Sequence, residues 1–241
     1  MNLGIDGKVA LVTAASKGLG KATALALAGE GVRVAICARG EEALRATESE
    51  IRALGADVLA IVADVTAPDS PARLVAETAA HFGGLDILVG NAGGPPPARA
   101  LEISDDQIAA AVNANLTTSV RLVREAVPGM RQRGWGRICL ITSFSIKQPI
   151  PGLSLSNLAR TGLWAWAKTA AQDLFPAGIT LNLACPGHFA TDRMKQLGGD
   201  PNHMGDPADF GRIVAFLCSQ PCNYLSSAAI NVDGAAVVGL L

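Results

Sequence analysis

Short apolar segments alternate with longer helix-like ones along almost the whole chain, and this alternation constrains the fold more than any other feature. The short segments are β-branched and apolar at successive positions, which is typical of strands buried on both faces. Such strands form parallel sheets that helices cover. The expected strands are Val9–Thr13, Arg33–Cys37, Asp57–Ala63, Ile87–Gly90, Arg137–Thr142, Thr180–Ala184 and Ala229–Val232, and the expected helices span 19–30, 41–54, 68–82, 105–132, 153–175 and 207–219.

This order of elements predicts a doubly wound α/β fold with a parallel sheet of seven strands flanked by helices. A chain of 241 residues is long enough for one such domain with a large core, so residues 1–241 are expected to form a single domain. Ligands of doubly wound sheets bind at the carboxyl ends of the strands. The segments that directly follow the strands are therefore the first candidates for a functional site.

The charge balance argues against nucleic acid and membrane partners. Lysine and arginine total 20 and aspartate and glutamate 21, so the net charge is −1 and no basic surface is expected. The apolar stretch 228–241 is interrupted by Asn231 and Asp233 and is too short to span a bilayer. The first eight residues lack the charged, apolar and cleavage regions of a signal peptide, which predicts a cytoplasmic protein.

The chain has five cysteines, an odd number for a disulfide framework. In a reducing compartment, cysteines in apolar segments are expected to be buried free thiols. The three histidines are scattered, and no cysteine and histidine share a spacing typical of metal ligands, so no metal is expected.

The first expected strand runs into a turn with glycines and then into a helix. Such a turn lets the backbone approach a pyrophosphate, and the start of the helix supplies main-chain N–H groups for it. A plain strand-to-helix turn is the alternative. The candidate nucleotide-binding residues of this turn are Thr13, Ala15, Ser16, Lys17, Gly18, Leu19 and Gly20.

This turn resembles the Thr-Gly-x-x-x-Gly-x-Gly motif of the short-chain dehydrogenase/reductase family, with Ala14 in place of the first glycine. The resemblance covers nearly the whole chain, and residues 145–157 are similar to a divergent branch likened to 3-oxoacyl-ACP reductases. It implies a Rossmann fold and hydride transfer between a nicotinamide cofactor and a carbonyl or alcohol. It also implies further cofactor contacts at Asp64, Val65, Asn91, Ala92, Gly93, Pro186, Gly187 and Thr191, and a proton-relay role for Asn115.

The charge after the second expected strand bears on the choice of cofactor. Proteins that bind NAD(H) usually place an acidic residue there to bond the ribose hydroxyls. Here the strand is followed by Arg39, and Lys17 precedes the motif glycine. Two cations near the expected 2′-phosphate favour NADP(H) over NAD(H), because arginine binds phosphate in a bidentate way. Both could instead be solvated surface cations.

The family's reaction uses a tyrosine that exchanges the proton, a lysine four residues later and a serine thirteen residues before the tyrosine. Ser143 aligns with that serine, but Ser156 and Arg160 stand where the tyrosine and lysine are expected. A phenol has a pKa of about 10, and an aliphatic hydroxyl is a far weaker acid. Arg160 can still bond the cofactor ribose, but it cannot relay a proton because it does not deprotonate.

Two titratable residues near the expected strand ends are candidates for the missing acid. Lys147 lies four residues after Ser143, and His188 directly follows Pro186-Gly187. A solvated lysine and a hydrogen-bonded structural histidine are the alternatives, and neither is excluded by the sequence.

Three functions remain open. The first is an NADP(H)-dependent oxidoreductase acting on a small-molecule carbonyl or acyl thioester, with an atypical active site. The second is a catalytically impaired dinucleotide-binding protein with a regulatory or partner role, and the third is a non-redox enzyme on the same fold.

Two further expectations follow from the resemblance. The segment after Thr191 is shorter than the family's usual lid over the substrate. The long helices are the family's usual packing faces, which predicts a homotetramer, with a dimer next, and contacts through Leu163, Trp164, Trp166, Ala170 and Ala171. The alternative is that some of these residues form a core stripe that faces the sheet.

Overall fold

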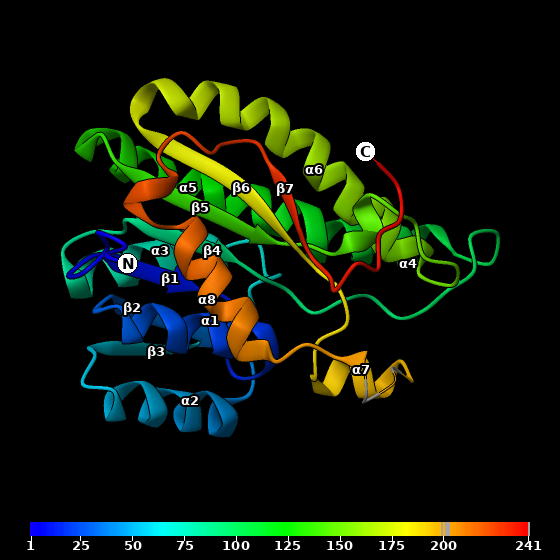
Figure 1. Cartoon of the computed structure of the whole chain (residues 1–241), viewed down its shortest axis with the longest axis horizontal. Helices are drawn as coiled ribbons and strands as arrows, with labels where there is room; N and C mark the ends of the chain where they lie inside the picture. Colours follow the sequence, from blue (N-terminus) through cyan, green and yellow to red (C-terminus); the bar gives the residue numbers. More distant parts are fainter. Residues whose placement is uncertain (199, 201–202, 241) are drawn as a thin grey trace.

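The computed structural model describes residues 1–198, 200 and 203–240, and its centre is a sheet of seven strands (Figure 1). The strand order is β3-β2-β1-β4-β5-β6-β7, and every neighbouring pair is parallel. The order reverses beside β1, where doubly wound sheets open a crevice for ligands. The strands are β1 (Val9–Val12), β2 (Arg33–Ala38), β3 (Val58–Val62), β4 (Ile87–Gly90), β5 (Gly136–Ile141), β6 (Ile179–Pro186) and β7 (Ala229–Val232).

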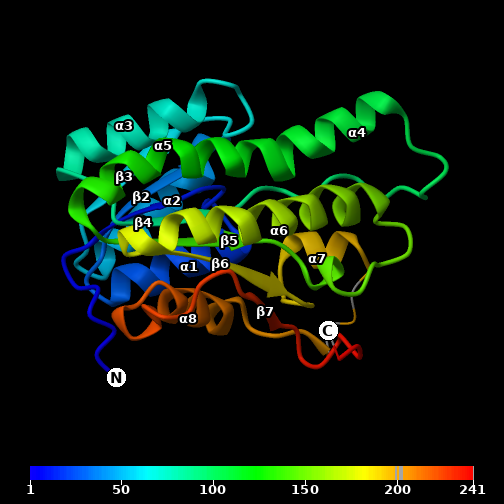
Figure 2. The same ribbon diagram turned by 90° about the horizontal axis from the view of Figure 1, so that it is seen from above.

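Helices cover both faces of the sheet, as Figure 2 shows from above. One face carries α1, α2 and α8, and the other carries α3, α5 and α6. The expected doubly wound α/β fold is confirmed, and each expected strand is present to within two residues at either end. The helices are α1 (Gly18–Gly29), α2 (Glu41–Ala53), α3 (Ser70–Phe82), α4 (Asp105–Val112), α5 (Thr118–Arg133), α6 (Ser154–Leu174), α7 (Asp192–Gln196) and α8 (Pro207–Leu217).

The expected helix 105–132 contains a wider π-helical turn, Asn113–Thr117, between α4 and α5. The hydroxyl of Thr118 donates to the carbonyl oxygen of Asn113 at 2.8 Å and so satisfies an acceptor within this turn. Such turns occur often at functional sites. Asn115 lies in the turn and is buried.

The core explains two expectations about side chains. All five cysteines are free and buried, as expected. Leu163 and Ala171 are buried in the core beneath α6, so they are not available for contacts between copies of the chain. Trp164, Trp166 and Ala170 are half-buried against the same core. Within the described part of the chain, no helix is long and apolar enough to cross a membrane.

Candidate active site

The crevice at the centre of the sheet is held by hydrogen bonds between the loops after β1 and β4. The hydroxyl of Thr13 donates to the carbonyl oxygen of Asn91 at 2.7 Å and accepts from its main-chain N–H at 2.8 Å. The side-chain amide of Asn91 donates to the carbonyl oxygen of Ala14 at 3.4 Å. These bonds hold the two loops at a fixed separation, so they set the width of the crevice in which a nucleotide would bind.

The turn after β1 is packed tightly enough to require glycine at its end. A Cβ built on Gly20 would lie 2.4 Å from the carbonyl oxygen of Ala14, so no larger residue fits there without movement of the backbone. Ala14 has φ 49°, a left-handed conformation that favours glycine. The substituted motif position therefore keeps the backbone shape of a glycine turn at some cost in stability.

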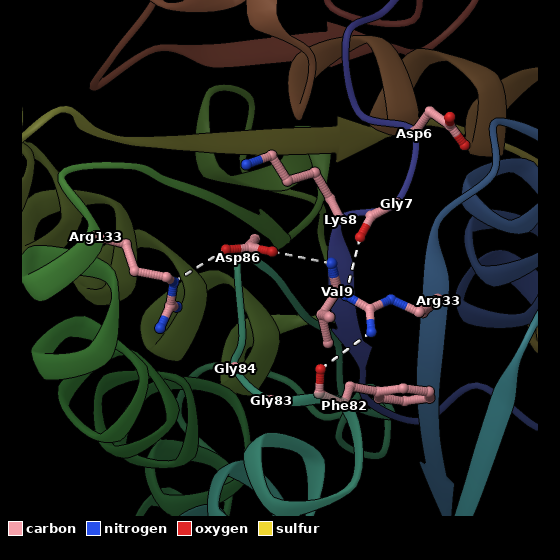
Figure 3. A pocket seen from close by; sticks show the side chains of 10 residues that line it. All are labelled: Asp6, Gly7, Lys8, Val9, Arg33, Phe82, Gly83, Gly84, Asp86 and Arg133. Atoms are coloured by element: carbon pink, nitrogen blue, oxygen red, sulfur yellow. Dashed lines mark hydrogen bonds and ion pairs between the residues drawn. The ribbon is translucent and has the colours of Figure 1, made fainter.

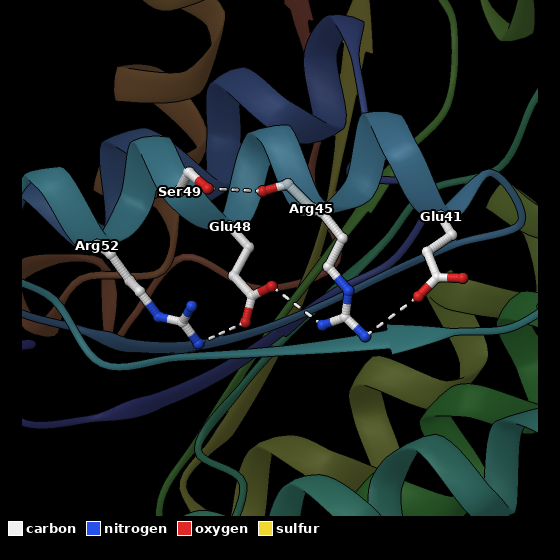
Figure 4. Close-up of polar contacts among 5 residues, drawn as sticks. All are labelled: Glu41, Arg45, Glu48, Ser49 and Arg52. Carbon is white, nitrogen blue, oxygen red and sulfur yellow. Dashed lines mark hydrogen bonds and ion pairs between the residues drawn. The ribbon is translucent and has the colours of Figure 1, made fainter.

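Helix α2 supports this turn from below. The hydroxyl of Thr47 donates to the carbonyl oxygen of Ser16 at 3.2 Å. Next to it, the carboxylate of Glu48 is buried between Arg45 at 3.0 Å and Arg52 at 2.6 Å (Figure 4). All three side chains lie on α2, so these i,i+3 and i,i+4 pairs stabilise the helix itself.

The expected adenosine end combines an ionised carboxylate with a cation. Asp64 accepts from the main-chain N–H and the hydroxyl of Thr66 at 3.0 and 2.8 Å. The main-chain bond first, then the hydroxyl, lowers the pKa of the Asp64 carboxyl, and the charge of Arg39 adds to the lowering. Arg39 is exposed just past the end of β2. These residues leave a positive charge where a 2′-phosphate is expected.

Four further expected cofactor residues differ in their surroundings. The side chain of Ala15 is buried, and its N–H donates to the carbonyl oxygen of Cys37 in β2. Val65 is buried in the core. Leu19 is half-buried, and Gly93 is exposed with open space beside it. Their expected cofactor contacts stay predictions.

Ser143 and Ser156 lie near the carboxyl end of β5. The hydroxyl of Ser143 accepts from the main-chain N–H of Ser145 at 3.1 Å, so its own hydrogen is free to point elsewhere. Ser156 lies in the first turn of α6 and is half-buried. Its hydroxyl has no hydrogen-bond partner within the described residues.

The guanidinium of Arg160 binds the ends of two central strands. Its Nη1 donates to the carbonyl oxygens of Ile141 and Thr142, both at 3.0 Å, and its Nη2 donates to that of Ala92 at 3.4 Å. Arg160 thus braces the backbone beneath the crevice. Burial is the main cause, and the charge of Arg193 the second, that lowers the pKa of Arg160 to about 10.

The two candidate acids have different surroundings. Lys147 is half-buried, and its charge acts on the thiol of Cys185 at the end of β6, where burial raises the pKa of the thiol to about 11. His188 is exposed, and its ring packs edge-on against Phe144 with the ring centroids 5.6 Å apart. Lys147 is therefore the more buried of the two candidates, whereas His188 lies on the outside.

Asn115 provides an acceptor inside the site. The residue is 3% exposed, and its Oδ1 has no hydrogen-bond partner in the described part of the protein. Buried polar atoms are nearly always bonded in native proteins. An unpartnered buried oxygen in a π-helical turn supports the expected relay position of Asn115.

Three consecutive residues at the start of α7 bridge the crevice, and sequence reasoning found only the first of them. A Cβ built on Gly18 would stand 3.5 Å from the methyl carbon of Thr191. Asp192 forms an exposed ion pair with Lys17 at 3.6 Å. Arg193 reaches the other side and donates to the carbonyl oxygen of Pro95 at 2.7 Å. The sequence could have indicated Arg193 as a site residue, because it lies two positions after Thr191.

The expected short lid begins with this helix of five residues. Residues 199 and 201–202 of the same segment lie outside the described residues.

At the end of β6, Gly187 donates its N–H to the carbonyl oxygen of Val232. A Cβ built on Gly187 would stand 2.5 Å from the Cα of Asp233, so the chain after β7 packs directly on this loop. Pro186, the last residue of β6, is buried.

A cavity of about 350 Å³ lies at the opposite edge of the sheet (Figure 3). Two of its charged side chains are paired: Asp86 accepts from Arg133 and from the N–H of Val9, both at 3.1 Å, and Arg33 donates to the carbonyl oxygens of Gly7 and Phe82. These bonds hold the amino ends of the strands, so the cavity has a structural explanation.

The fold and the glycine turn at the crevice define the class, a dinucleotide-binding protein of the doubly wound type. The chain belongs to the short-chain dehydrogenase family, because the family model described as short chain dehydrogenase matches residues 8–202. The protein is thus an oxidoreductase of this type that binds a nicotinamide dinucleotide.

Known proteins similar to this chain match it over nearly its full length. The chain is 33% identical over 243 residues to a Synechocystis protein named 3-oxoacyl-[acyl-carrier-protein] reductase, covering 97% of this chain and 98% of the relative. It is 31% identical to L-sorbose reductase from Gluconobacter frateurii, solved with NADPH and L-sorbose, with a TM-score of 0.93 and full coverage of both chains. A 7α-hydroxysteroid dehydrogenase solved with NADH is 27% identical, covers 100% of this chain and 98% of its own, and has a TM-score of 0.93.

Replacing Ala14 by glycine should stabilise the protein. The left-handed conformation costs roughly 1–2 kcal/mol for an L-residue, and the extra freedom of unfolded glycine offsets about 0.5–1 kcal/mol of that gain. Urea unfolding of Ala14→Gly should therefore show a higher free energy of unfolding. The matched control Ala46→Gly, in exposed α2, should lower it. A loss of stability in Ala14→Gly would contradict the assigned conformation.

Proposed function

We propose that the protein is an NADP(H)-dependent oxidoreductase that reduces a small-molecule carbonyl compound or oxidises the corresponding alcohol. A residue other than the family's tyrosine would exchange the proton. The observation that carries this proposal is the crevice itself. The bonds between Thr13 and Asn91 hold it, and Gly20 packs against the carbonyl of Ala14. Because the Synechocystis relative is named a 3-oxoacyl-ACP reductase, 3-oxoacyl thioesters are one substrate class for testing.

Charge supports NADP(H) over NAD(H). Arg39 is exposed directly after β2, at the position where an acidic residue would bond the ribose hydroxyls of NAD(H). Its guanidinium can bind a phosphate with two N–H bonds. Lys17 is also exposed, with its ammonium 3.6 Å from Asp192. An exposed pair of this kind is worth little, so Lys17 can exchange its partner for a phosphate at low cost.

The protein's own residues would act at the two atoms of the carbonyl group. The bound nicotinamide would supply the hydride to carbon. The hydroxyl of Ser143 would donate to the carbonyl oxygen and stabilise the negative charge that develops there. Arg160 holds positive charge at the strand ends and keeps the loops in place. Asn115 would accept a hydrogen bond within the proton path.

The proton would come from the ammonium group of Lys147 and pass to the carbonyl oxygen as the alcohol forms. Solvent would then protonate the neutral lysine again. The half-buried position of Lys147, four residues after Ser143, supports this assignment. Arg160 does not take the role because its N–H groups already donate to main-chain carbonyl oxygens at the strand ends. The hydroxyl of Ser156 is too weak an acid.

Assembly and location are also proposed. A homotetramer is the first expectation for the assembly and a dimer the second. In either, copies of the chain would contact each other through the outer face of α6, where Leu158 is 44% exposed and Trp164 and Trp166 are half-buried. Five free thiols are compatible with a cytoplasmic protein, because disulfides are rare in that compartment.

Replacing Arg39 by alanine should weaken NADPH binding and leave NADH binding nearly unchanged. A charge-assisted hydrogen bond contributes about 1.5–3 kcal/mol, which corresponds to roughly a 10–100-fold higher Kd for NADPH. Nicotinamide fluorescence measures both cofactors. Arg99→Ala, an exposed arginine on the loop after β4, serves as the control and should bind both as the wild type does. Equal loss for both cofactors in Arg39→Ala would contradict the assignment of the 2′-phosphate.

Replacing Lys147 by alanine should lower kcat by about 10²–10⁴, because the general acid is lost. Lys147→Arg should not restore it, since arginine keeps the charge but cannot donate the proton. The rate of NADPH oxidation with acetoacetyl and other β-keto thioesters measures this, with Lys168→Ala on the exposed side of α6 as the control.

The companion variant His188→Ala decides between the two candidates. A large loss of kcat in His188→Ala with Lys147→Ala unaffected would make histidine the acid. No wild-type turnover together with intact NADPH binding would instead favour a dinucleotide-binding protein without catalysis.

A further inference from the structure

Two arginines from helices far apart in the sequence meet the same loop after β4. Arg160 of α6 donates from Nη2 to the carbonyl oxygen of Ala92 at 3.4 Å, and Arg193 of α7 donates from Nη2 to that of Pro95 at 2.7 Å. The Arg193 guanidinium also lies against Gly94, since a Cβ built on that residue would stand 3.4 Å from Nη2. Both cations therefore lie beside the stretch Ala92 to Pro95.

Within the described part of the chain, no ion pair includes Arg160 or Arg193. Carbonyl oxygens accept their N–H groups but carry no net charge. Arg160 is only 7% exposed, and a buried cation without a counter-charge is costly. The charge of Arg193 contributes to the low pKa of Arg160, which means that the two cations act on each other.

Lys147 adds a third positive charge at the same edge of the sheet, and its field reaches Cys185. The nearby carboxylates are engaged elsewhere. Asp192 pairs with Lys17, and Asp233 accepts from the main-chain N–H groups of Ala235 and Val237 at 3.2 and 3.0 Å. The substrate end of the crevice is thus positive, although the chain as a whole has a net charge of −1.

We infer that the substrate is an anionic carbonyl compound, an oxo acid with a free carboxylate, and that Arg193 is the residue that binds this carboxylate. The inference rests on the proposed function and narrows its substrate class. A carboxylate accepts two parallel N–H bonds from one guanidinium, and Arg193 donates only one of its N–H bonds to Pro95. A bound carboxylate would also offset part of the positive charge of Arg193 and Arg160.

The phosphates of the cofactor are the competing anions. Their expected place is the turn at Gly18 to Gly20 and the start of α1, where Lys17 is nearby. Arg193 points away from that turn, to the loop after β4 on the other side of the crevice. This direction assigns Arg193 to the substrate and Lys17 to the cofactor.

The test compares acetoacetate with methyl acetoacetate, which differ in the carboxylate charge, in wild type, Arg193→Gln and Lys195→Gln. Lys195 is the matched control, an exposed cation of the same helix. The wild type should prefer the acid. Arg193→Gln should lower kcat/KM for the acid by about 10–100-fold, as expected for a lost charge-assisted bond, and should leave the ester nearly unchanged. Lys195→Gln should behave as the wild type, and the NADPH Kd should stay within about twofold in both variants.

Equal kcat/KM values for acid and ester in the wild type, or an equal loss for both in Arg193→Gln, would overturn the inference. Weaker NADPH binding by Arg193→Gln would overturn it too, because the arginine would then serve the cofactor. If the wild type reduces neither compound, calorimetry of acetoacetate binding in the presence of NADP⁺ decides. Tighter binding of the acid than of the ester, lost in Arg193→Gln, supports the inference and places the failure in the proposed reaction. No such preference contradicts it.

Discussion

The hydroxyl of Thr13, bonded in both directions to the backbone of Asn91, is the interaction on which the rest of the site depends. It joins the loops after β1 and β4 at the point where the strand order reverses. Beside these loops, Gly20 in the first turn of α1 packs directly against the carbonyl of Ala14. A loosened pair of loops would lose the cradle for a dinucleotide even if every glycine remained.

Charge in the site is arranged around an arginine instead of a lysine. Arg160 donates three N–H bonds to main-chain carbonyls, so it braces the strand ends. Among the described residues, no carboxylate forms an ion pair with its charge. A lysine at this position could release a proton, whereas an arginine cannot. Ser156 stands where the family's tyrosine acid is expected, so the acid function has to lie elsewhere. The bridging residue Arg193 places a second cation on the loop that Arg160 contacts.

The sequence predicted the sheet and the glycine turn because both depend on local patterns. Strands buried on both faces are apolar at successive positions, and a turn that approaches a phosphate needs glycine at fixed spacing. The direction of the Arg160 side chain could not be predicted, since its acceptors come from loops after two different strands. The bond of Arg193 to Pro95 joins residues 98 positions apart, and the π-helical turn at Asn115 has no local signature. Such features depend on tertiary contacts that neither spacing nor composition records.

The most direct test of the account is calorimetric titration of the wild-type protein with NADPH and with NADH. The account predicts saturable binding of one molecule per chain, tighter for NADPH than for NADH. No uptake of either cofactor at millimolar concentration would contradict the central claim that this crevice is a nicotinamide dinucleotide site, and only the architecture would remain.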